Sequence, residues 1–379
     1  MKNYQSDFEN FDTHIWLNAA SEGPLPKVSA EALKESIVWK SLPYQLDIPK
    51  FVSVPLELKK SIGGLIGAEA RDVILANSAS YGIHLIADGF PWQKGDEICL
   101  MQNDFPTDIL PWLALEKKGV DVRQIKADDR ILTPEELEAA LTQQTRLVCL
   151  SHVHTFSGMK LDIKGCAALC RGKNIPLVVN ISQSAGTMPI DVKALGVDAV
   201  VCAGYKWLLG PYGTGFAWMT PELRDRLDIN RAYWVSSLSE EELHSEGALS
   251  YKDLKSARKL DVFGTANFFN FVPFRTSIDY LLGIGLDVVQ QYHRELLDGF
   301  INVFPKGHYS IFSSLEKGDR SSLLVFSHKD PAKNPNIHAS LCKSNIYTAL
   351  WKGRIRLSPH IYNTPKQLEI LTEYLQNLA

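Results

Sequence analysis

VDAVVCAGYKWLLGPYGTGFAW, residues 197–218, places one lysine between two apolar runs. The runs 198–202 and 216–219 each predict a buried strand, and the glycines between them allow the backbone to turn tightly. Lys206 follows the first run directly, with an aromatic residue on either side, so water solvates its amine poorly. Desolvation lowers the pKa of a lysine from its ordinary value of about 10.4 and makes the amine a nucleophile that forms Schiff bases with carbonyl groups. A lysine that extends into water from a strand–loop corner fits these residues equally well.

A second stretch, IPLVVNISQSAGTMPIDV at residues 175–192, repeats the pattern of a strand followed by polar residues. The apolar run 175–179 predicts the strand, and Asn180 and Gln183 follow it. In open α/β sheets, ligands bind at the carboxyl ends of the strands. We therefore expect Asn180 and Lys206 at neighbouring strand ends, which favours a reactive role for Lys206.

Together these stretches resemble the class V aminotransferase family of pyridoxal-phosphate (PLP) enzymes, which includes cysteine desulfurases, isopenicillin N epimerase-like proteins and kynureninase. That family carries a D-x-x-[QH]-[SA]-x-G segment before its Schiff-base lysine and G-x-K-W-L-x-G-P-x-G around it. Further similar motifs follow in the same order from about Trp16 to the C-terminus. The resemblance implies a PLP cofactor held as a Schiff base by the catalytic residue Lys206, which would also carry the proton at the substrate Cα.

Strands and helices alternate along most of the chain, which predicts an α/β fold with a mostly parallel central sheet and helices on both faces. Strands are expected at 73–76, 97–101 and 147–150, and helices at 28–39, 54–65, 134–141 and 163–171. From about Pro273 the pattern changes to a long helix at 274–304, a strand at 323–326 and helices near 337–343 and 365–378. The resemblance implies the PLP-dependent transferase fold of type I.

These patterns predict two domains. The large PLP-binding domain is expected at 13–272, and the smaller C-terminal α+β domain at 273–379. The polar segment 1–12 is expected to pack near the smaller domain.

The composition is that of an ordinary globular protein, with 379 residues, 45% hydrophobic and 22% charged, and a net charge of −3. This charge gives no reason to expect nucleic acid or an anionic membrane as a partner. Neither a signal peptide nor a run of about 18 apolar residues is visible. Cys166 and Cys170 are one helical turn apart, but no second Cys/His pair accompanies them, so no metal site is predicted. The six cysteines are scattered along the chain, which fits a reducing cytoplasm.

The phosphate group of PLP has an expected position in the sequence. Residues 77–82, NSASYG, follow a predicted strand and open a helix, whose free N–H groups and dipole favour an anion. The resemblance places the phosphate at Ala79, Ser80 and Tyr205, with Thr265 contributed by the partner subunit of a homodimer. Ordinary N-capping by serine is the alternative for the helix start.

The cofactor ring has two further expected contacts. In NDFPTDILPW, residues 103–112, the resemblance places Phe105 over the ring, where cysteine desulfurases have a histidine. Phenylalanine stacks but cannot exchange a proton, and an ordinary core phenylalanine is the competing interpretation. The resemblance also implies that Gln183 bonds the phenolic oxygen of the cofactor.

Four residues are expected on the substrate side. His154 and Thr155 occupy variable positions of a family loop, SHVHTFSG, and Asn18 lies in the entry segment WLNAASEGPLP. Arg356, in GRIRLSPHIYNT, would bind the substrate α-carboxylate as a bidentate fork. Arg354 shares the strand face by spacing, so only the family pattern favours Arg356. The alternatives are structural: His154 could simply hold its loop in place, and Arg356 could fasten the C-terminal domain by pairing with an acidic group.

Asn180 is the main departure from the family. The family has an aspartate there, which pairs with the protonated pyridine nitrogen and strengthens the ring as an electron sink. Asparagine forms hydrogen bonds without a charge, so the ring nitrogen is expected to be protonated less often. A change of chemistry, an engineered substitution and a lineage without catalysis all fit this residue.

The expected function is that of a PLP-dependent enzyme acting on a small amino acid, by an aminotransferase-like or a lyase reaction. The alternatives to this function are amino-acid epimerisation and PLP binding with little catalysis because of Asn180. Desulfuration of cysteine through an enzyme thiol is not expected. That chemistry needs a mobile thiol near the substrate, whereas Cys342 lies in a stretch that predicts a helix.

Overall fold

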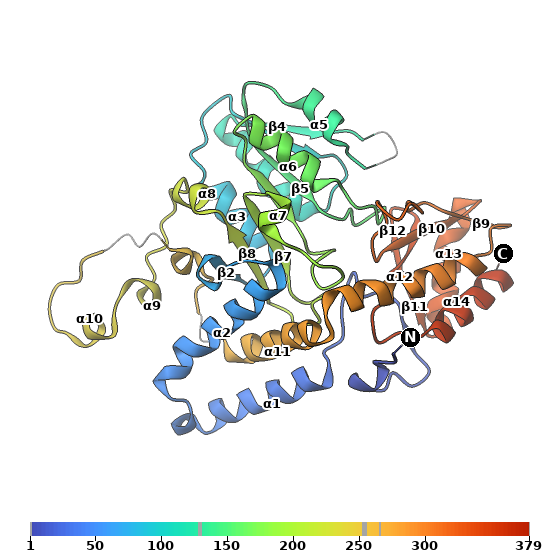
Figure 1. The fold of residues 1–379 in the computed structure, drawn as a ribbon, viewed down its shortest axis with the longest axis horizontal. Helices are drawn as coiled ribbons and strands as arrows, with labels where there is room; N and C mark the ends of the chain where they lie inside the picture. Colours follow the sequence, from blue (N-terminus) through green and yellow to red (C-terminus); the bar gives the residue numbers. More distant parts are fainter. Residues whose placement is uncertain (1, 128–130, 252–255, 265–266, 379) are drawn as a thin grey trace.

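A computed structural model describes residues 2–127, 131–251, 256–264 and 267–378 (Figure 1). Its centre is a seven-stranded sheet with the strand order β2-β8-β7-β6-β5-β3-β4. Strand β8 runs antiparallel to both of its neighbours, and all other neighbouring strands of this sheet pair in parallel. The strands are β2 Val73–Ala76, β3 Glu97–Met101, β4 Asp121–Ile125, β5 Thr145–Ser151, β6 Leu177–Asn180, β7 Ala199–Ala203 and β8 Gly215–Met219.

Apart from the edge strand β4, which is largely exposed, the sheet is buried on both faces, as the continuous apolar runs of its strands predict. Val179 and Cys202 belong to one apolar cluster, together with Cys166 of α6 (Ile163–Gly172). Val178 and Val201 belong to a second cluster, together with Ile83 of α3 (Ala79–Gly89). Alternate strand residues thus face opposite helices, and the expected α/β fold is confirmed.

The remaining helices surround this sheet and form the C-terminal part (Figure 1). Helix α11 packs on α1 and α2, through rings such as those of Trp39, Phe51 and Phe268. These helices are α1 Lys27–Ser41, α2 Ile48–Ile66, α4 Leu110–Leu113, α5 Pro134–Ala140, α7 Val192–Leu195, α8 Pro221–Asp225, α9 Trp234–Ser237, α10 Glu240–His244, α11 Phe268–Ile284, α12 Leu286–Val303, α13 Asn334–Lys343 and α14 Pro365–Asn377.

The C-terminal part holds a separate antiparallel sheet, in the order β12-β13-β10-β9, with α12, α13 and α14 near it (Figure 1). Its strands are β9 Tyr309–Ile311, β10 Leu324–His328, β12 Ala349–Trp351 and β13 Arg354–Leu357. The N-terminal strand β1 (Ile15–Trp16) pairs in parallel with β11 (Ile346–Tyr347). The preceding segment also contacts this part, since the ring of Phe8 packs edge-on against Tyr362.

The single long helix expected at 274–304 is wrong. Two helices, α11 and α12, meet at Gly285, which has a φ of 91°. That angle lies in the left-handed region, which glycine adopts without strain and which a continuous right-handed helix excludes. The domain division predicted at 272/273 falls within α11 and stays a prediction.

Within the described residues, no helix is both long enough and apolar enough to cross a membrane.

Candidate functional site

Lys206 lies just beyond the carboxyl end of β7, and only 7% of its surface is exposed. Its Nζ is 5.2 Å from the ring centroid of Phe105 and 5.9 Å from that of Tyr205. The entry segment passes directly over this position, since the Gly23 amide donates to the Tyr205 carbonyl at 2.9 Å. A Cβ at Gly23 would overlap the Lys206 carbonyl oxygen, so the segment can approach this closely only with glycine. The reactive amine is therefore enclosed from three chain segments.

Burial lowers the pKa of Lys206 from its ordinary value of 10.5 to about 8. Desolvation is the largest cause, and the positive charge of Arg356 acts in the same direction, while Cys202 and Asp108 oppose it. At pH 7 about a tenth of the amine is therefore neutral, far more than for a lysine of ordinary pKa, and the neutral form is the nucleophile.

This shifted pKa predicts how the stability of the PLP-free protein depends on pH. Between pH 8 and 10.5 the unfolded chain binds more protons than the folded chain, so Lys206 makes the free energy of unfolding rise with pH across that window. Lys206→Met should stabilise the protein at pH 7 and remove this rise. Urea titrations at pH 7 and pH 10 measure the difference, and an equal pH response in both proteins would contradict the shift.

Asn180, at the end of β6, is bonded to a buried carboxylate. Its Nδ2 donates to the two oxygens of Asp108 at 2.9 and 3.0 Å, and its Oδ1 accepts from the Ser182 amide at 2.9 Å. Burial and the nearby carboxylate of Asp104 raise the pKa of Asp108 well above its ordinary value. Ser151 joins the two carboxylates, since its Oγ lies 2.8 Å from Asp104 and 3.3 Å from Asp108. Position 180 thus has an amide in place of the family's aspartate, and the carboxylate of Asp108 is hydrogen-bonded directly to that amide.

Gln183 connects the lysine loop to the substrate side. Its Oε1 accepts from the indole N–H of Trp207 at 2.8 Å, which fixes the orientation of the amide. Its Nε2 lies 3.1 Å from the Ala20 carbonyl and 3.2 Å from Thr155 Oγ1. The donor side of Gln183 therefore faces the loop that carries Thr155.

Arg356, on β13, is a buried cation with neutral partners. Only 2% of it is exposed, and its Nη2 donates to Ser21 Oγ at 2.7 Å and to Asn18 Oδ1 at 3.5 Å. Its Nη1 donates to the Thr155 carbonyl at 3.4 Å, and its Nε has no partner among the described residues. Burial lowers its pKa from 12.5 to about 10. No carboxylate of the described residues pairs with it, which leaves a site for an external anion.

The first turn of α3 lies beside the loop that carries Phe105. Ser78 caps the helix, with its Oγ accepting from the Tyr81 amide at 3.2 Å, and Ser80 Oγ lies 3.0 Å from Thr107 Oγ1. Ala79 is buried next to this pair. Ser78 is thus the N-cap of α3, as the alternative interpretation expected. The hydroxyl of Ser80 does not cap the helix and lies in its first turn, bonded to Thr107. Thr265 lies outside the described residues.

His154 is oriented differently from Thr155. Its Nε2 is 3.0 Å from the Asn103 carbonyl and its Nδ1 is 2.8 Å from Ser157 Oγ. These contacts hold the loop together, and none of them joins His154 to Lys206 or Arg356. Thr155 is the residue of this pair that the structure brings to Gln183 and Arg356.

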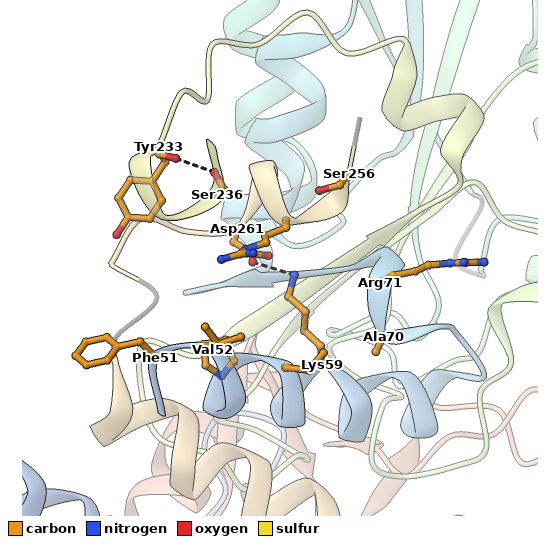
Figure 2. A pocket seen from close by; sticks show the side chains of 12 residues that line it. Phe51, Val52, Lys59, Ala70, Arg71, Tyr233, Ser236, Ser256 and Asp261 are labelled. Carbon is orange, nitrogen blue, oxygen red and sulfur yellow. Dashed lines mark hydrogen bonds and ion pairs between the residues drawn. The ribbon is translucent and has the colours of Figure 1, made fainter. Parts of the chain in front are cut away.

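A cavity of about 290 Å³ lies elsewhere, between α2 and the segments 233–236 and 256–261 (Figure 2). Lys59 and Asp261 form an ion pair of 2.9 Å in its wall. Asp261 also accepts from the Leu75 amide at 2.8 Å, so this pair fastens the segment to β2. Neither Lys206 nor Arg356 is among the residues that line this cavity, so it is separate from the Lys206 site.

Three residues of the site were missed by reasoning from sequence: Asp108, Ser151 and Ser21. Asp108 had a signal, since it belongs to the quoted FPTD motif that also supplies Phe105. Ser21 and Ser151 also lie in quoted motifs, but nothing in the sequence singles out these serines, because their partners lie 335 and 43–47 residues away.

The residues present fit PLP. An amine with a lowered pKa serves the covalent attachment, and the Phe105 ring lies 5.2 Å from that amine, where it can stack on a pyridine. The amide of Asn180 lies at the neighbouring strand end, paired through Val201 of β7. The guanidinium of Arg356 bonds only neutral oxygens among the described residues, so it could also pair with the carboxylate of a ligand.

Known proteins resemble this chain over nearly its whole length. Residues 50–371 match the aminotransferase class-V family. A Methanothermobacter thermautotrophicus protein described as "Probable cysteine desulfurase" is 26% identical, over 97% of this chain and 95% of its own. Isopenicillin N epimerase from Streptomyces clavuligerus is 23% identical, over 76% of this chain and 73% of its own.

Solved structures share the fold. A lyase variant with glycine covalently linked to its PLP cofactor superposes with a TM-score of 0.88 at 19% identity, covering 100% of both chains. The same enzyme, a cystine C–S lyase, in complex with its product cysteine persulfide, gives a TM-score of 0.86 at 19% identity, covering 96% of this chain and 97% of that one. The chain therefore belongs to the aminotransferase class-V family and is a PLP-dependent enzyme of fold type I.

Proposed function

We propose that this enzyme binds an α-amino acid through Arg356 and removes its Cα proton with Lys206, in an elimination that expels the β substituent. The buried guanidinium of Arg356 carries this proposal, because it lacks an acidic partner among the described residues and contributes to the lowered pKa of Lys206. A carboxylate there would form charge-assisted bonds in place of those to neutral oxygens.

In this proposal Lys206 holds PLP covalently, Phe105 stacks on its ring and Gln183 bonds its phenolic oxygen. Ala79, Ser80, Tyr205 and Thr265 of the partner subunit hold the phosphate. PLP, when bound, withdraws electrons from the substrate Cα and so acidifies its proton. Thr155 and Asn18 border Arg356 and would position the substrate carboxylate. Once the substrate amine has displaced Lys206 from the cofactor, its free Nζ would accept the Cα proton.

Asn180 favours elimination over amino transfer or epimerisation. A neutral amide next to the ring nitrogen makes a weaker electron sink than an aspartate. Amino transfer and epimerisation need the Cα electron pair to persist until a proton returns. In elimination that pair forms a double bond as the β substituent leaves with its own bonding electrons, so the demand on the ring is smaller.

The bond between Asn180 and Asp108 predicts the effect of an exchange. Asn180→Asp places two carboxylates about 3 Å apart, so one must keep a proton and the free energy of unfolding should fall as pH rises above the ordinary aspartate pKa. Asn180→Asp with Asp108→Asn restores one acid and one amide, with the acid nearer the ring. That double variant should exchange the Cα proton of a bound amino acid for deuterium faster than the parent. Slower exchange would show that the site is built around a neutral ring.

The thiol of Cys342 does not fit a desulfurase nucleophile. It lies inside α13, with its Sγ 3.9 Å from His338 Nε2, and burial raises its pKa. A reactive cysteine needs a lowered pKa and a mobile segment. Desulfuration through this thiol therefore has no support, whereas the cystine C–S lyase of the same fold supports elimination.

The test is to incubate the enzyme with L-cystine and L-cysteine and to measure pyruvate, ammonia and released sulfur species. Elimination predicts equal amounts of pyruvate and ammonia, unchanged in Cys342→Ser. Conversion of PLP to pyridoxamine phosphate, with a keto acid that keeps its β substituent, would show amino transfer. Sulfide release that disappears in Cys342→Ser would show a desulfurase.

We also propose that the enzyme is a homodimer whose active sites lie at the subunit interface. Large apolar side chains are exposed on α2 and on the segment after α8. They are 40–56% exposed and comprise Phe51, Val52, Leu56, Trp234 and Phe263. The first three also line the cavity of Figure 2. A second copy would cover these side chains. Sedimentation of a monomer with full PLP content would contradict the dimer.

A cytoplasmic location is part of the same proposal. All six cysteines are free thiols, and five are buried. A reducing compartment preserves such thiols. Cell fractionation that finds the protein outside the cytoplasm would contradict this location.

A further inference from the structure

A second cavity lies where the C-terminal sheet meets the large sheet, beside the loop that carries Thr155. It has a volume of about 440 Å³, within the usual range of small-molecule sites. Three segments form its wall: residues 101–103 at the end of β3, the loop after β5 with His154, Phe156 and Ser157, and the hairpin between β12 and β13. Phe312 and the segment 126–127 complete it.

The charge of this wall has one sign. Lys352, Arg354 and Lys126 line the cavity together with His154, and none of its described lining residues is acidic. Among the described residues, Asp104 interacts with His154, but its carboxylate is buried and bonds inward to Ser151. The cavity therefore favours a negatively charged ligand.

The two hairpin cations are held by aromatic rings. The guanidinium of Arg354 lies 3.8 Å from the ring centroid of Phe312, and Lys352 Nζ lies 5.3 Å from that of Phe156. Neither forms an ion pair with a carboxylate of the described residues. Cation–π contact positions such groups and leaves their hydrogen-bond donors available, because an aromatic face accepts no conventional hydrogen bond.

The hairpin turn places a lysine where the backbone disfavours it. Lys352 and Gly353 have φ angles of 49° and 73°, which is the geometry of a two-residue type I′ turn. Asparagine is the preferred first residue of such a turn, and a lysine in the left-handed region is uncommon. The lysine at this unfavourable position places a cation at the rim of the cavity.

The cavity adjoins the proposed active site. Phe156 separates the two, since its ring lies 6.4 Å from Phe105 on one side and beside Lys352 on the other. Arg354 and Arg356 are two residues apart on β13 and so face the same side of the sheet. One strand thus presents a guanidinium to each site.

We propose that this cavity is a binding site for the carboxylate or phosphate group of a small molecule, with Lys352 and Arg354 as its charged contacts. Two sources carry that chemistry: an acidic side chain of the amino-acid substrate itself, or a separate anion. The first source rests on the function proposed above, and the second does not.

The direct test titrates the PLP-loaded enzyme with glutarate and with inorganic phosphate in a calorimeter. Lys352→Asn removes the charge and keeps a residue that suits the turn, and Arg354→Gln removes the second charge. Each should weaken anion binding about three- to tenfold, and rising salt should weaken it further. Lys306→Asn is the matched control, because Lys306 also precedes a glycine in an exposed turn but lies outside the cavity lining. If neither glutarate nor phosphate binds, or if Lys306→Asn weakens binding as much as the cavity variants do, the cavity is not a site for a separate anion.

The second arm compares L-2-aminoadipate with L-norleucine by spectral titration of the bound cofactor. A substrate side chain in the cavity predicts tighter binding of the acid, and Lys352→Asn should remove that preference without changing norleucine binding. Equal binding of the two amino acids together with failed anion titrations would overturn the site. If no amino acid changes the spectrum, the proposed function fails, and the calorimetry still decides the anion site.

Discussion

Lys206→Ala is expected to abolish covalent attachment of PLP and to lower turnover of any amino-acid substrate by at least about 10²–10⁴-fold, the usual contribution of a positioned general base. The amine is buried, carries a pKa lowered to about 8 and lies 5.2 Å from the Phe105 ring. No described neighbour in hydrogen-bond contact with the site offers a second amine. Absorbance of the purified protein before and after borohydride, together with a pyruvate assay, measures both losses.

Lys206→Arg is the matched control for charge. It keeps a cation in the same enclosed position but has no amine that can attach PLP, so it should behave as the alanine variant does. Retained colour that borohydride bleaches, or turnover near that of the parent, in either variant would contradict the role of Lys206.

Arg356→Lys is expected to weaken binding of α-amino acids at least about tenfold while PLP stays bound. A lysine cannot reproduce the bidentate fork, and loss of a charge-assisted bond costs about 1.5–3 kcal/mol. Spectral titration with amino acids and with their decarboxylated amines measures the effect. The parent should prefer the acids, and the variant should lose that preference.

The same variant separates this role from a purely structural one. Arg356 has no ion pair with the described residues, so its replacement by lysine should change the melting temperature little. Arg294→Lys, on the exposed face of α12, serves as the control. A large drop in melting temperature with an unchanged amino-acid titration would assign Arg356 to holding the C-terminal part in place.

Local patterns predicted the elements of the large sheet well. Strands β2 and β3 begin and end where their apolar runs predict, and α5 begins at the predicted residue, where Thr133 and Glu136 form a capping box. Continuous apolar runs and capping residues act within a few positions, so a single sequence contains the information. The break at Gly285 was missed because a glycine inside an apolar helical pattern is often tolerated, and only the tertiary packing selects its left-handed conformation.

The site divides in the same way. Lys206 and Asn180 could be placed at neighbouring strand ends from their own segments, and their strands do pair. The preference for Arg356 over Arg354 came from the family pattern. The structure gives the two arginines different surroundings, since Arg356 is buried and reaches Ser21 while Arg354 stacks on Phe312, and the substrate role of Arg356 stays a prediction.

The FPTD motif marks Asp108, but the contact of Asp108 with Asn180 could not be predicted from sequence alone. This contact joins positions 72 residues apart, through the packing of the loop after β3 against the end of β6. No local pattern encodes such a contact. The substitution at position 180 is therefore interpretable only with the structure, as a displacement of the acid by one hydrogen bond.

The central claim is that Lys206 carries the cofactor. The most direct measurement is to reduce the PLP-loaded enzyme with borohydride, digest it and locate the phosphopyridoxyl group by mass spectrometry. The account predicts one labelled peptide, with the label on Lys206 in the segment 197–218. A label on Lys59 or on any other lysine, or a PLP-loaded protein in which reduction labels no lysine, would contradict it.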